Sequence, residues 1–302
     1  MIVTVTPNPA VDYTVSLTDE PTAGTVTRTD RTRYDAGGKG INVSKYLASL
    51  DTDTLATGFL GGFVGEYLET QLETAELPAE FVAIDGTTRL NTTLLTPDAE
   101  YKINQTGPTV DEGAVDALVS RLRERDPNTV VIAGSLPPGI DTATVDRIAA
   151  AGEWETAIDL NGDVLGELSG EYVLCKPNRK ELAAATGTTV DSVENAIEAA
   201  HVLRKRGFER VVASLGADGA VLVSDERALY APALDVEVVD TVGAGDAMLS
   251  GVLSALDRGE GERAALGTGI AVSSRVVALP GTSVPSLANI DTTRDTVAVE
   301  RR

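Results

Sequence analysis

Short apolar runs alternate with longer stretches of helical periodicity along most of the chain. The apolar runs fall at residues 2–5, 54–59, 130–133, 156–160, 172–175 and 211–214. Between them, apolar residues recur at helical spacing over residues 42–50, 112–125, 143–150, 190–206 and 246–256. Strands that alternate with helices predict a mostly parallel sheet covered by helices on both faces, a three-layer αβα sandwich of the α/β class. Ligands of such folds bind at the carboxyl ends of the strands.

Two polar regions interrupt this alternation. Residues 25–34 are rich in threonine and arginine and show β character without an apolar face. Residues 87–104 resemble a hairpin around Pro97 and Asp98, with strands too polar for a central sheet. We expect both regions to form one small sheet, inserted at about residues 11–35 and 86–105 into a single domain of residues 1–302. Such a sheet would serve as a lid over a pocket or as a dimer surface.

The charge of the chain narrows the range of partners. It carries 25 basic against 46 acidic residues, a net charge of -21. Such a surface repels nucleic acids and anionic membranes, so neither is an expected partner. Scarce lysine with abundant acid predicts adaptation to a salt-rich cytoplasm; the alternative is a merely acidic mesophilic protein. No apolar run approaches the roughly 18–20 residues of a membrane span, and the amino terminus lacks a basic signal region, so a cytoplasmic protein is expected.

Cysteine and histidine occur once each, which removes several kinds of chemistry. A single cysteine, Cys175, forms no intramolecular disulfide, and its place at the end of an apolar run predicts a buried, inert thiol. A single histidine, His201, supplies no histidine-rich zinc site. A metal held by thiolates or imidazoles is therefore not expected.

The strongest chemical signal is the glycine-rich segment at residues 240–247 (DTVGAGDA), which precedes a helical pattern. Gly243 and Gly245 allow the backbone to approach an anion, and the start of a helix presents unpaired N–H groups to it. A carboxylate at Asp246 would repel that anion unless it accepts the proton of a hydroxyl that attacks a phosphoryl group. The alternative is a plain capping aspartate.

Two common nucleotide-binding patterns are missing. Met248 stands where the third glycine of a dinucleotide fingerprint would be, which disfavours a nicotinamide oxidoreductase. Gly40 follows Lys39, so the segment at residues 37–43 (GGKGINV) is not a Walker A loop. This second glycine cluster also opens a helix, where Lys39 suits an anion and Asn42 can bond hydroxyls in both directions. The sequence predicts a nucleotide enzyme without a P-loop.

Together, residues 37–43 and 240–246 resemble the two signature regions of the PfkB (ribokinase-like) carbohydrate kinases. Four further segments resemble the family in order: residues 6–12 (TPNPAVD), 134–139 (GSLPPG), 176–181 (KPNRKE) and 214–219 (SLGADG). The resemblance implies a ribokinase-like sandwich with a β lid, ATP and Mg²⁺, a sugar substrate and a homodimer through the lid. Residues 88–91 (TRLN) and 102–104 (KIN) resemble the branch of 1-phosphofructokinases and tagatose-6-phosphate kinases.

The resemblance also assigns roles to individual residues. The catalytic set is Asp246 as base with the turn residues Gly243, Ala244 and Gly245. The sugar and its phosphate are expected at Asp12, Gly37, Gly38, Lys39, Asn42, Arg89, Lys102 and Ser135. The nucleotide is expected at Lys176, Asn178, Ser214, Gly216 and Gly219, and magnesium at Glu181 and Asn178 through water. Asn178 and Glu181, three residues apart on a helix, can reach one site. Arg28 is a further phosphate candidate, with Arg31 and Arg33 as alternatives, and Asp159 a further carboxylate near the metal.

The predicted reaction is transfer of the γ-phosphoryl group of ATP to a ketohexose phosphate. The preferred specific substrate is fructose 1-phosphate, and the product would be fructose 1,6-bisphosphate. Arg89 and Lys102 are cations in an acidic protein and favour a substrate that already carries a phosphate. Fructose 6-phosphate, tagatose 6-phosphate and an unphosphorylated sugar are the alternative substrates. A non-catalytic sugar-phosphate sensor is the alternative outside the enzymes, but it has no need of Asp246.

Overall fold

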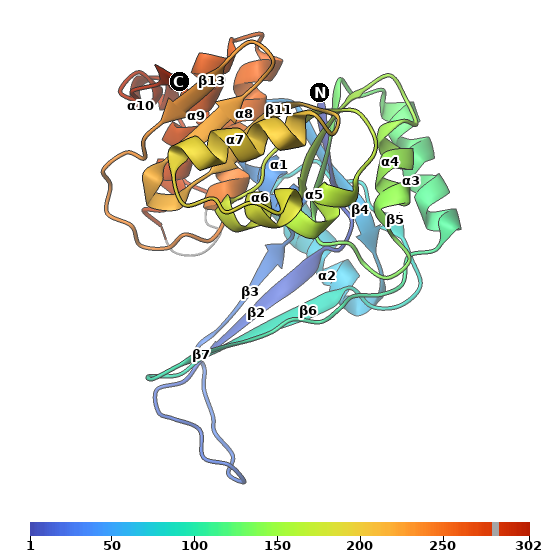
Figure 1. Cartoon of the computed structure of the whole chain (residues 1–302). Helices are drawn as coiled ribbons and strands as arrows, with labels where there is room; N and C mark the ends of the chain where they lie inside the picture. Colours follow the sequence, from blue (N-terminus) through green and yellow to red (C-terminus); the bar gives the residue numbers. More distant parts are fainter. Residues whose placement is uncertain (280–283) are drawn as a thin grey trace.

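The computed structural model of the protein describes residues 1–279 and 284–302. In this part of the chain a ten-stranded sheet forms the centre, with strand order β14-β13-β12-β11-β10-β9-β8-β1-β4-β5 (Figure 1). Neighbouring strands run parallel from β5 to β11 and antiparallel from β11 to β14, which confirms the mostly parallel sheet. The strands are β1 (Ile2–Thr6), β4 (Thr54–Leu60), β5 (Val82–Ala83), β8 (Thr129–Gly134), β9 (Glu155–Leu160), β10 (Tyr172–Cys175), β11 (Phe208–Ser214), β12 (Ala220–Val223), β13 (Ala228–Ala231) and β14 (Glu300–Arg301).

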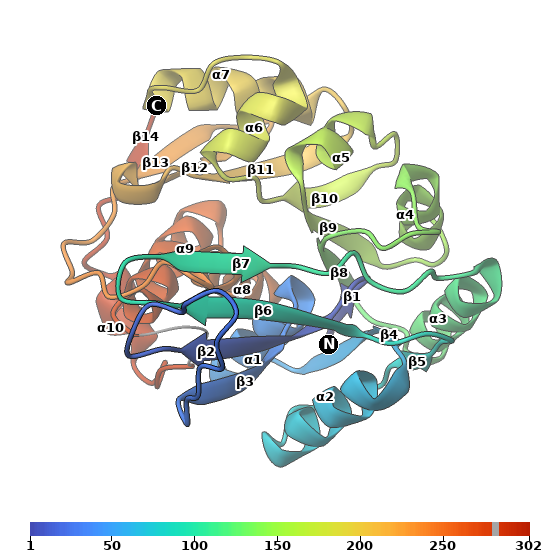
Figure 2. The ribbon, with the colours of Figure 1, turned by 90° about the horizontal axis from the view of Figure 1, so that it is seen from below.

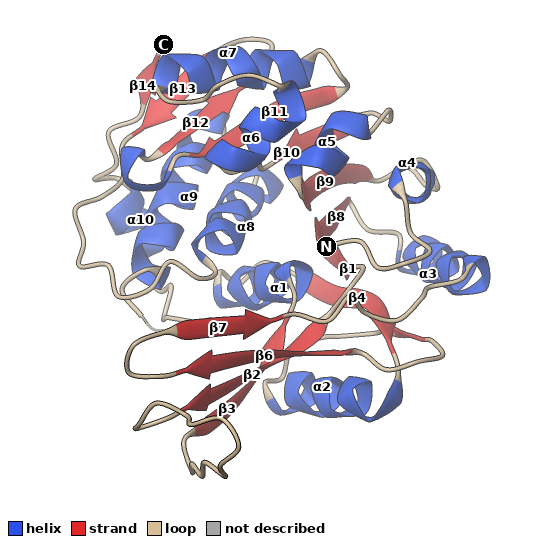
Figure 3. Ribbon diagram, turned by 60° about the horizontal axis from the view of Figure 1, so that its bottom comes forward, coloured by secondary structure: helices blue, strands red, loops and turns tan. Residues whose placement is uncertain are grey.

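Helices cover both faces of this sheet, so the predicted three-layer sandwich is confirmed (Figure 3). One face packs against α3 (Glu112–Arg125), α4 (Thr142–Ala149), α5 (Gly162–Glu167), α6 (Arg179–Thr186) and α7 (Val193–Arg204). The other packs against α1 (Lys39–Ser49), α8 (Ala244–Asp257) and α9 (Glu262–Val276). The short helix α10 (Ile290–Arg294) lies against α9, and a 3-10 turn, η1 (Gly216–Asp218), follows β11. Across residues 1–279 and 284–302, no helix combines the length and apolarity needed to cross a membrane.

The central strands are buried on both faces, which explains why they read as continuous apolar runs rather than as alternating ones. Every residue of β1 and β4 is buried. Helix α1 starts at Lys39, three residues before the apolar periodicity from which its start was predicted. Its first turn carries Gly40, and glycine in a sequence favours a loop over a helix.

A second, four-stranded sheet, called the lid sheet below, extends away from the first in Figure 1, and its strands lie side by side in Figure 2. Its order is β3-β2-β6-β7, with β2 (Ala10–Ser16), β3 (Thr32–Gly37), β6 (Arg89–Leu95) and β7 (Glu100–Ile103). Residues 32–34 of the first polar region and most of the second therefore lie in one sheet, and β6 and β7 make the predicted hairpin, closed by the Thr96 N–H donating to the Ala99 carbonyl. The prediction of β structure before Thr32 was wrong, because β2 pairs with β3 only up to that residue. That the lid sheet is an insertion into a single domain stays a prediction.

The two faces of the lid sheet differ in chemistry. Asp12 of β2 lies opposite Asp35 of β3 and Asn91 of β6, so these three side chains project from one face. Val11, Ala36 and Leu90 project from the other face and pack with α2 (Gly62–Thr74). The polar face is thus the one turned away from α2.

Candidate active site

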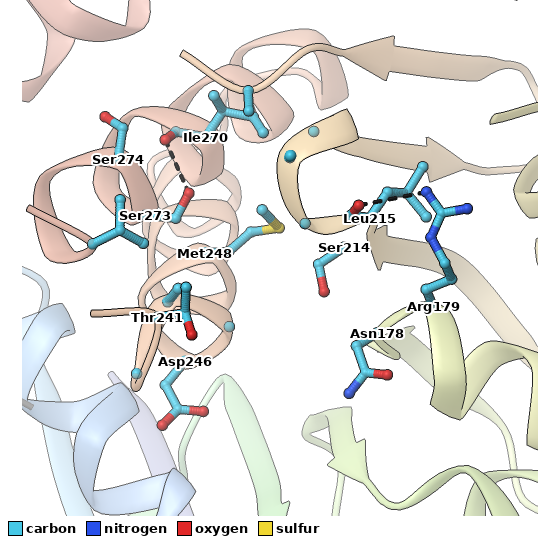
Figure 4. Close-up of a pocket in the computed structure, with 18 of the residues that line it drawn as sticks. Asn178, Arg179, Ser214, Leu215, Thr241, Asp246, Met248, Ile270, Ser273 and Ser274 are labelled. Atoms are coloured by element: carbon cyan, nitrogen blue, oxygen red, sulfur yellow. Dashed lines mark hydrogen bonds between the residues drawn. The ribbon is translucent and has the colours of Figure 1, made fainter. Parts of the chain in front are cut away.

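A cavity of about 980 Å³ opens beside the carboxyl ends of β10 and β11 (Figure 4). One wall is formed by the first turn of α8 and by α9, the other by the start of α6 and by η1. All the residues predicted for the nucleotide line it: Lys176, Asn178, Ser214, Gly216 and Gly219. The turn residues Gly243, Ala244 and Gly245 line it too, with Asp246, Glu181 and Lys39. The structure therefore brings the catalytic and nucleotide candidates into one place, while their individual roles stay predictions.

The turn before α8 is shaped for an anion. Gly243 has a φ of 79°, a left-handed conformation that favours glycine, and it caps the helix without a side-chain hydrogen bond. The first turn of this 14-residue helix lines the cavity, so its N–H groups and positive dipole end face the space where a phosphate would lie. A Cβ on Gly245 would sit 3.2 Å from the Lys176 ammonium nitrogen, so glycine here also lets this lysine approach the turn.

Asp246 lies at one end of the cavity and is only 7% exposed (Figure 4). Its Oδ2 accepts a hydrogen bond of 2.9 Å from the Asn42 amide nitrogen, which fixes the orientation of the carboxylate. Burial and then the negative charge of Asp159 raise the pKa of Asp246 to about 6. The group is thus ionised at neutral pH but basic enough to take a proton, which is what a general base requires.

Two lysines and a buried aspartate lie beneath the turn. Asp159 is fully buried, and its two oxygens pair with the ammonium of Lys39 at 2.9 Å and of Lys176 at 3.3 Å. Burial alone would raise the pKa of Asp159, but Lys176 and Lys39 outweigh it and lower that pKa. The carboxylate is therefore a counter-charge to two lysines, and its place near a metal stays a prediction.

The position of Lys39 differs from the one predicted for it. It was expected to bind the phosphate of the sugar together with Arg89 and Lys102. Its ammonium instead pairs with Asp159 and lies 3.7 Å from Glu181 Oε1, among the residues of the nucleotide cavity. The role of Lys39 itself stays a prediction.

The Asn-x-x-Glu spacing has a structural cause of its own. Asn178 caps α6, where its Oδ1 accepts from the N–H groups of Lys180 and Glu181, and Glu181 Oε2 accepts from the Asn178 N–H at 2.8 Å. This capping box leaves Glu181 Oε1 and the Asn178 amide nitrogen for other partners. Residues 1–279 and 284–302 contain no group of three or more His, Cys, Asp or Glu side chains that could hold a metal ion. Mg²⁺ bound with a nucleotide needs only one or two carboxylates beside water and phosphate, so Glu181 fits that smaller requirement.

The sugar candidates gather on the other side of Asp246, around the polar face of the lid sheet. Asp12 Oδ1 accepts from the Asn91 amide nitrogen at 3.0 Å, and burial raises the pKa of Asp12, partly offset by this bond. A Cβ on Gly37 would lie 2.2 Å from Asp12 Oδ2, so a larger residue here would displace the carboxylate. Gly38, with a φ of 131°, caps α1, which carries Asn42. Asp12, Gly37, Gly38 and Asn42 thus form one connected surface.

Arg89 and Ser135 are joined through Asn8. The Arg89 guanidinium donates to the Asn8 carbonyl at 2.5 Å and to the Gln105 carbonyl at 3.3 Å. The Asn8 amide nitrogen donates to the Ser135 hydroxyl at 3.3 Å. Burial lowers the pKa of Arg89, against the opposing charge of Asp12. Arg89 therefore has fixed backbone partners and a neighbouring carboxylate at the sugar side.

The remaining cations are more exposed. Lys102 is 57% exposed and pairs with Glu100 at 3.2 Å, but it lies opposite Thr93, two residues beyond Asn91 on the same face of the lid sheet. Arg28 and Arg31 lie outside the strands, whereas Arg33 lies in β3 and pairs with Asp35 at 2.6 Å. Of the three arginines, Arg33 is the one on the polar face.

Sequence reasoning missed three residues of this region. Asn8 and Asn91 lie within quoted motifs without a role, and Lys45 is one turn beyond Asn42 on α1. The Lys45 side chain is half-buried, its ammonium donates to the Ala36 carbonyl at 2.7 Å, and desolvation lowers its pKa. The scarcity of lysine was the signal that could have found it.

Comparisons with known proteins cover nearly the whole chain. The sequence model of the pfkB family carbohydrate kinases matches residues 6–289. The chain is 52% identical over 299 residues to a 1-phosphofructokinase of Haloferax volcanii, covering 99% of this chain and 98% of that protein. It is 36% identical to a 1-phosphofructokinase of Bacillus subtilis, covering 85% and 86% of the two chains. The crystal structure of phosphofructokinase-2 from Escherichia coli in complex with substrates and products has a TM-score of 0.87 at 26% identity, covering 97% and 98%.

Proposed function

The chain belongs to the pfkB family of carbohydrate kinases, and from this premise we propose that it phosphorylates fructose 1-phosphate with ATP, giving fructose 1,6-bisphosphate. The identity to the Haloferax volcanii 1-phosphofructokinase over almost the full length supports the choice of sugar. One observation carries the reaction type: Asp246, with a pKa of about 6, lies where the nucleotide cavity meets the sugar-side residues and is held there by Asn42.

Asp246 acts as the general base. It accepts the proton of the attacking primary hydroxyl as that oxygen forms a bond to the γ-phosphorus, while the bond to the bridging oxygen of ADP breaks. The N–H groups of Ala244, Gly245 and Asp246 at the start of α8 stabilise the charge on the transferring group. Lys39 and Lys176, anchored by Asp159, add two positive charges beside the same turn.

ATP occupies the cavity between α8, α9 and η1. Its volume of about 980 Å³ is at the upper end of the range for small-molecule sites, enough for a nucleotide with its phosphates. The apolar side chains of Met248 and Ile270 line one wall and suit a planar base, while Ser214 and Gly216 line the other. Glu181 and Asn178 would hold Mg²⁺ through water, and the ion would supply charge neutralisation of the phosphates.

The sugar binds between α1 and the polar face of the lid sheet. Asp12, Gly38 and Asn42 bind its hydroxyls, and Arg89, Lys102 and Ser135 bind the phosphate that it already carries. We assign Lys39 to the transferring phosphoryl group instead, because of its pairing with Asp159.

The surface of the enzyme bears on its oligomeric state and on the salt content of its surroundings. Tyr101 and Ile103 of β7 and Tyr34 of β3 are exposed large hydrophobic side chains on the face opposite Asp12. They support a homodimer formed through the lid sheets. The net charge of -21 supports a cytoplasm of high salt, as does the identity to a protein of Haloferax volcanii.

The test is ADP release with ATP and Mg²⁺ in high potassium chloride, comparing fructose 1-phosphate, fructose 6-phosphate, tagatose 6-phosphate and fructose. A clear preference in kcat/KM for fructose 1-phosphate is expected. Preference for another sugar would keep the mechanism and replace the substrate. No ADP release with any of the sugars from folded protein would contradict a kinase and favour a sugar-phosphate sensor, whose sugar binding calorimetry would detect.

A further inference from the structure

Arg179, the first residue of α6, joins three separate segments of the chain. Its Nη1 donates to the Val190 carbonyl at 3.0 Å, in the segment between α6 and α7. Its Nη2 donates to Asp218 Oδ2 at 2.5 Å and, over a longer distance of 3.5 Å, to the Leu215 carbonyl. Figure 4 shows this guanidinium beside Leu215, on the opposite side of the cavity from Asp246. The arginine therefore connects α6 with the turn that follows β11.

The turn after β11, at residues 215–219, owes its shape to two glycines. Gly216 has a φ of 66° and Gly219 a φ of 87°, both in the left-handed region. Within the turn, the Leu215 N–H donates to the Gly219 carbonyl at 2.8 Å, and the Gly219 N–H donates to the Gly216 carbonyl at 3.1 Å. Glycine permits this backbone conformation but also leaves the chain more freedom than other residues would. A contact from outside the turn would restrict that freedom.

One side of the turn faces the nucleotide cavity and the other faces solvent. Leu215, Gly216, Ala217 and Gly219 line the cavity. The side chain of Asp218 is 63% exposed, so its contact with Arg179 lies on the outer side. A displacement of the turn would therefore change the shape of the cavity, and Arg179 opposes such a displacement.

The pair of Arg179 with Asp218 differs from an ordinary surface ion pair. Exposed pairs contribute little, because two long side chains must be ordered to form them. The guanidinium of Arg179 is already fixed by the Val190 carbonyl, and its side chain is only 27% exposed, so Asp218 alone has to be ordered. Salt weakens charge interactions mainly beyond the Debye length, about 3 Å at 1 M, and this contact is shorter than that. The contact should persist in concentrated potassium chloride.

We propose that Arg179 is a positioning residue for the nucleotide, which acts through Asp218 and Leu215 to hold the turn after β11 in the place that ATP binding requires. This inference rests on the proposed function, in which ATP occupies the cavity. The guanidinium is engaged by protein acceptors and lies away from Asp246, so it takes no part in the transfer itself. Its removal weakens the binding of ATP and leaves the binding of the sugar intact.

The test compares wild type, Arg179→Met, Asp218→Ala and the double variant in high potassium chloride. Calorimetry with ATP and Mg²⁺ gives Kd for ATP, and ADP release gives kcat and both KM values. Arg179→Met is expected to raise Kd and KM for ATP by about 5- to 10-fold, with KM for the sugar and kcat at saturating ATP unchanged. Asp218→Ala should raise them by about 3- to 5-fold, and the double variant should be no worse than Arg179→Met, because the two residues act through one contact.

Arg206→Met is the matched control. Arg206 also ties segments of the chain together through backbone carbonyls, donating to Gly166 at 3.3 Å and to Ala185 at 2.6 Å. It does not line the nucleotide cavity. Both arginine variants should therefore lose stability, but only Arg179→Met should change the binding of ATP.

Three outcomes overturn the inference. The first is an unchanged Kd for ATP in Arg179→Met. The second is an equal rise in Arg206→Met, because a general loss of stability would then explain both variants. The third is full additivity in the double variant, because Arg179 would then not act through Asp218. Wild type that binds no ATP contradicts the proposed function itself and is recognised by that result. If Arg179→Met does not fold by circular dichroism, Arg179→Gln takes its place with the same expectations.

Discussion

Asp246→Asn should make the protein more stable while it removes the catalytic base. The folded protein raises the pKa of this carboxyl from 3.8 to about 6, so ionising it in the folded state is unfavourable. At 1.36 kcal/mol for each pH unit, the difference corresponds to about 3 kcal/mol of destabilisation above pH 6. Asparagine carries no charge and keeps an oxygen for the Asn42 amide nitrogen. Over 302 residues, about 3 kcal/mol raises Tm by about 5 °C.

The pH dependence identifies the cause. A carboxyl whose folded pKa is raised destabilises fully above the folded value, and the penalty disappears as pH falls toward 3.8. The advantage of Asp246→Asn should therefore shrink from about 3 kcal/mol at pH 7.5 to about half of that at pH 5 and to less than about 1 kcal/mol at pH 4.

Calorimetric unfolding in high potassium chloride measures the difference in stability between Asp246→Asn and wild type. The ADP-release assay measures kcat, which should fall by about 10²- to 10⁴-fold in this variant. Asp257→Asn, exposed at the other end of α8, removes the same charge from the surface and should change stability by less than about 0.5 kcal/mol. An Asp246→Asn protein no more stable than wild type at pH 7.5, or an advantage that does not vary with pH, would refute the reasoning.

Three further predictions concern other parts of the site. The kcat of wild type should fall below about pH 6 as Asp246 is protonated, and an acid limb of ADP release with its midpoint well away from pH 6 would indicate that another group is the base. Gly37→Ala should raise KM for the sugar by at least tenfold, with KM for ATP as the control, because its Cβ would lie 2.2 Å from Asp12 Oδ2. Cys175 is fully buried and burial raises the pKa of its thiol, so the native protein should resist iodoacetamide that labels the denatured chain; rapid native labelling would contradict this.

The fold was predictable where burial imposes a periodicity. Strands that are buried on both faces, and helices that pack on one face, occur where the apolar spacing predicted them. Residues 112–125, for example, form α3 as expected. Helix starts and strand ends that depend on polar residues were harder to predict. The helix expected from residue 190 begins at Val193, where Ser192 caps it by accepting from the Asn195 N–H. The β character expected before Thr32 failed because a strand needs a partner, which local sequence does not reveal.

In the site, too, some features could be predicted from the sequence and others could not. Its glycine turns and Asp246 could be located because their chemistry lies within one short segment. The contact of Lys39 with Asp159 could not be predicted, because the two residues lie 120 positions apart in the chain. The spacing of Asn178 and Glu181 was interpreted through metal binding alone, and the structure shows that it also forms a capping box. The capping box leaves Glu181 Oε1 for other partners, so the magnesium role stays a prediction.

Asp246 and Asp12 belong to different layers of the fold. The first stands on a helix that packs on the large sheet, the second on a strand of the lid sheet. If the proposed function holds, one part of the chain carries the phosphoryl transfer and another part binds and selects the sugar. Selection can then alter β2, β6 and β7 for a new sugar while the turn before α8 stays constant. An enzyme divided in this way can diversify its substrates by mutations that do not have to preserve, or rebuild, its catalytic base.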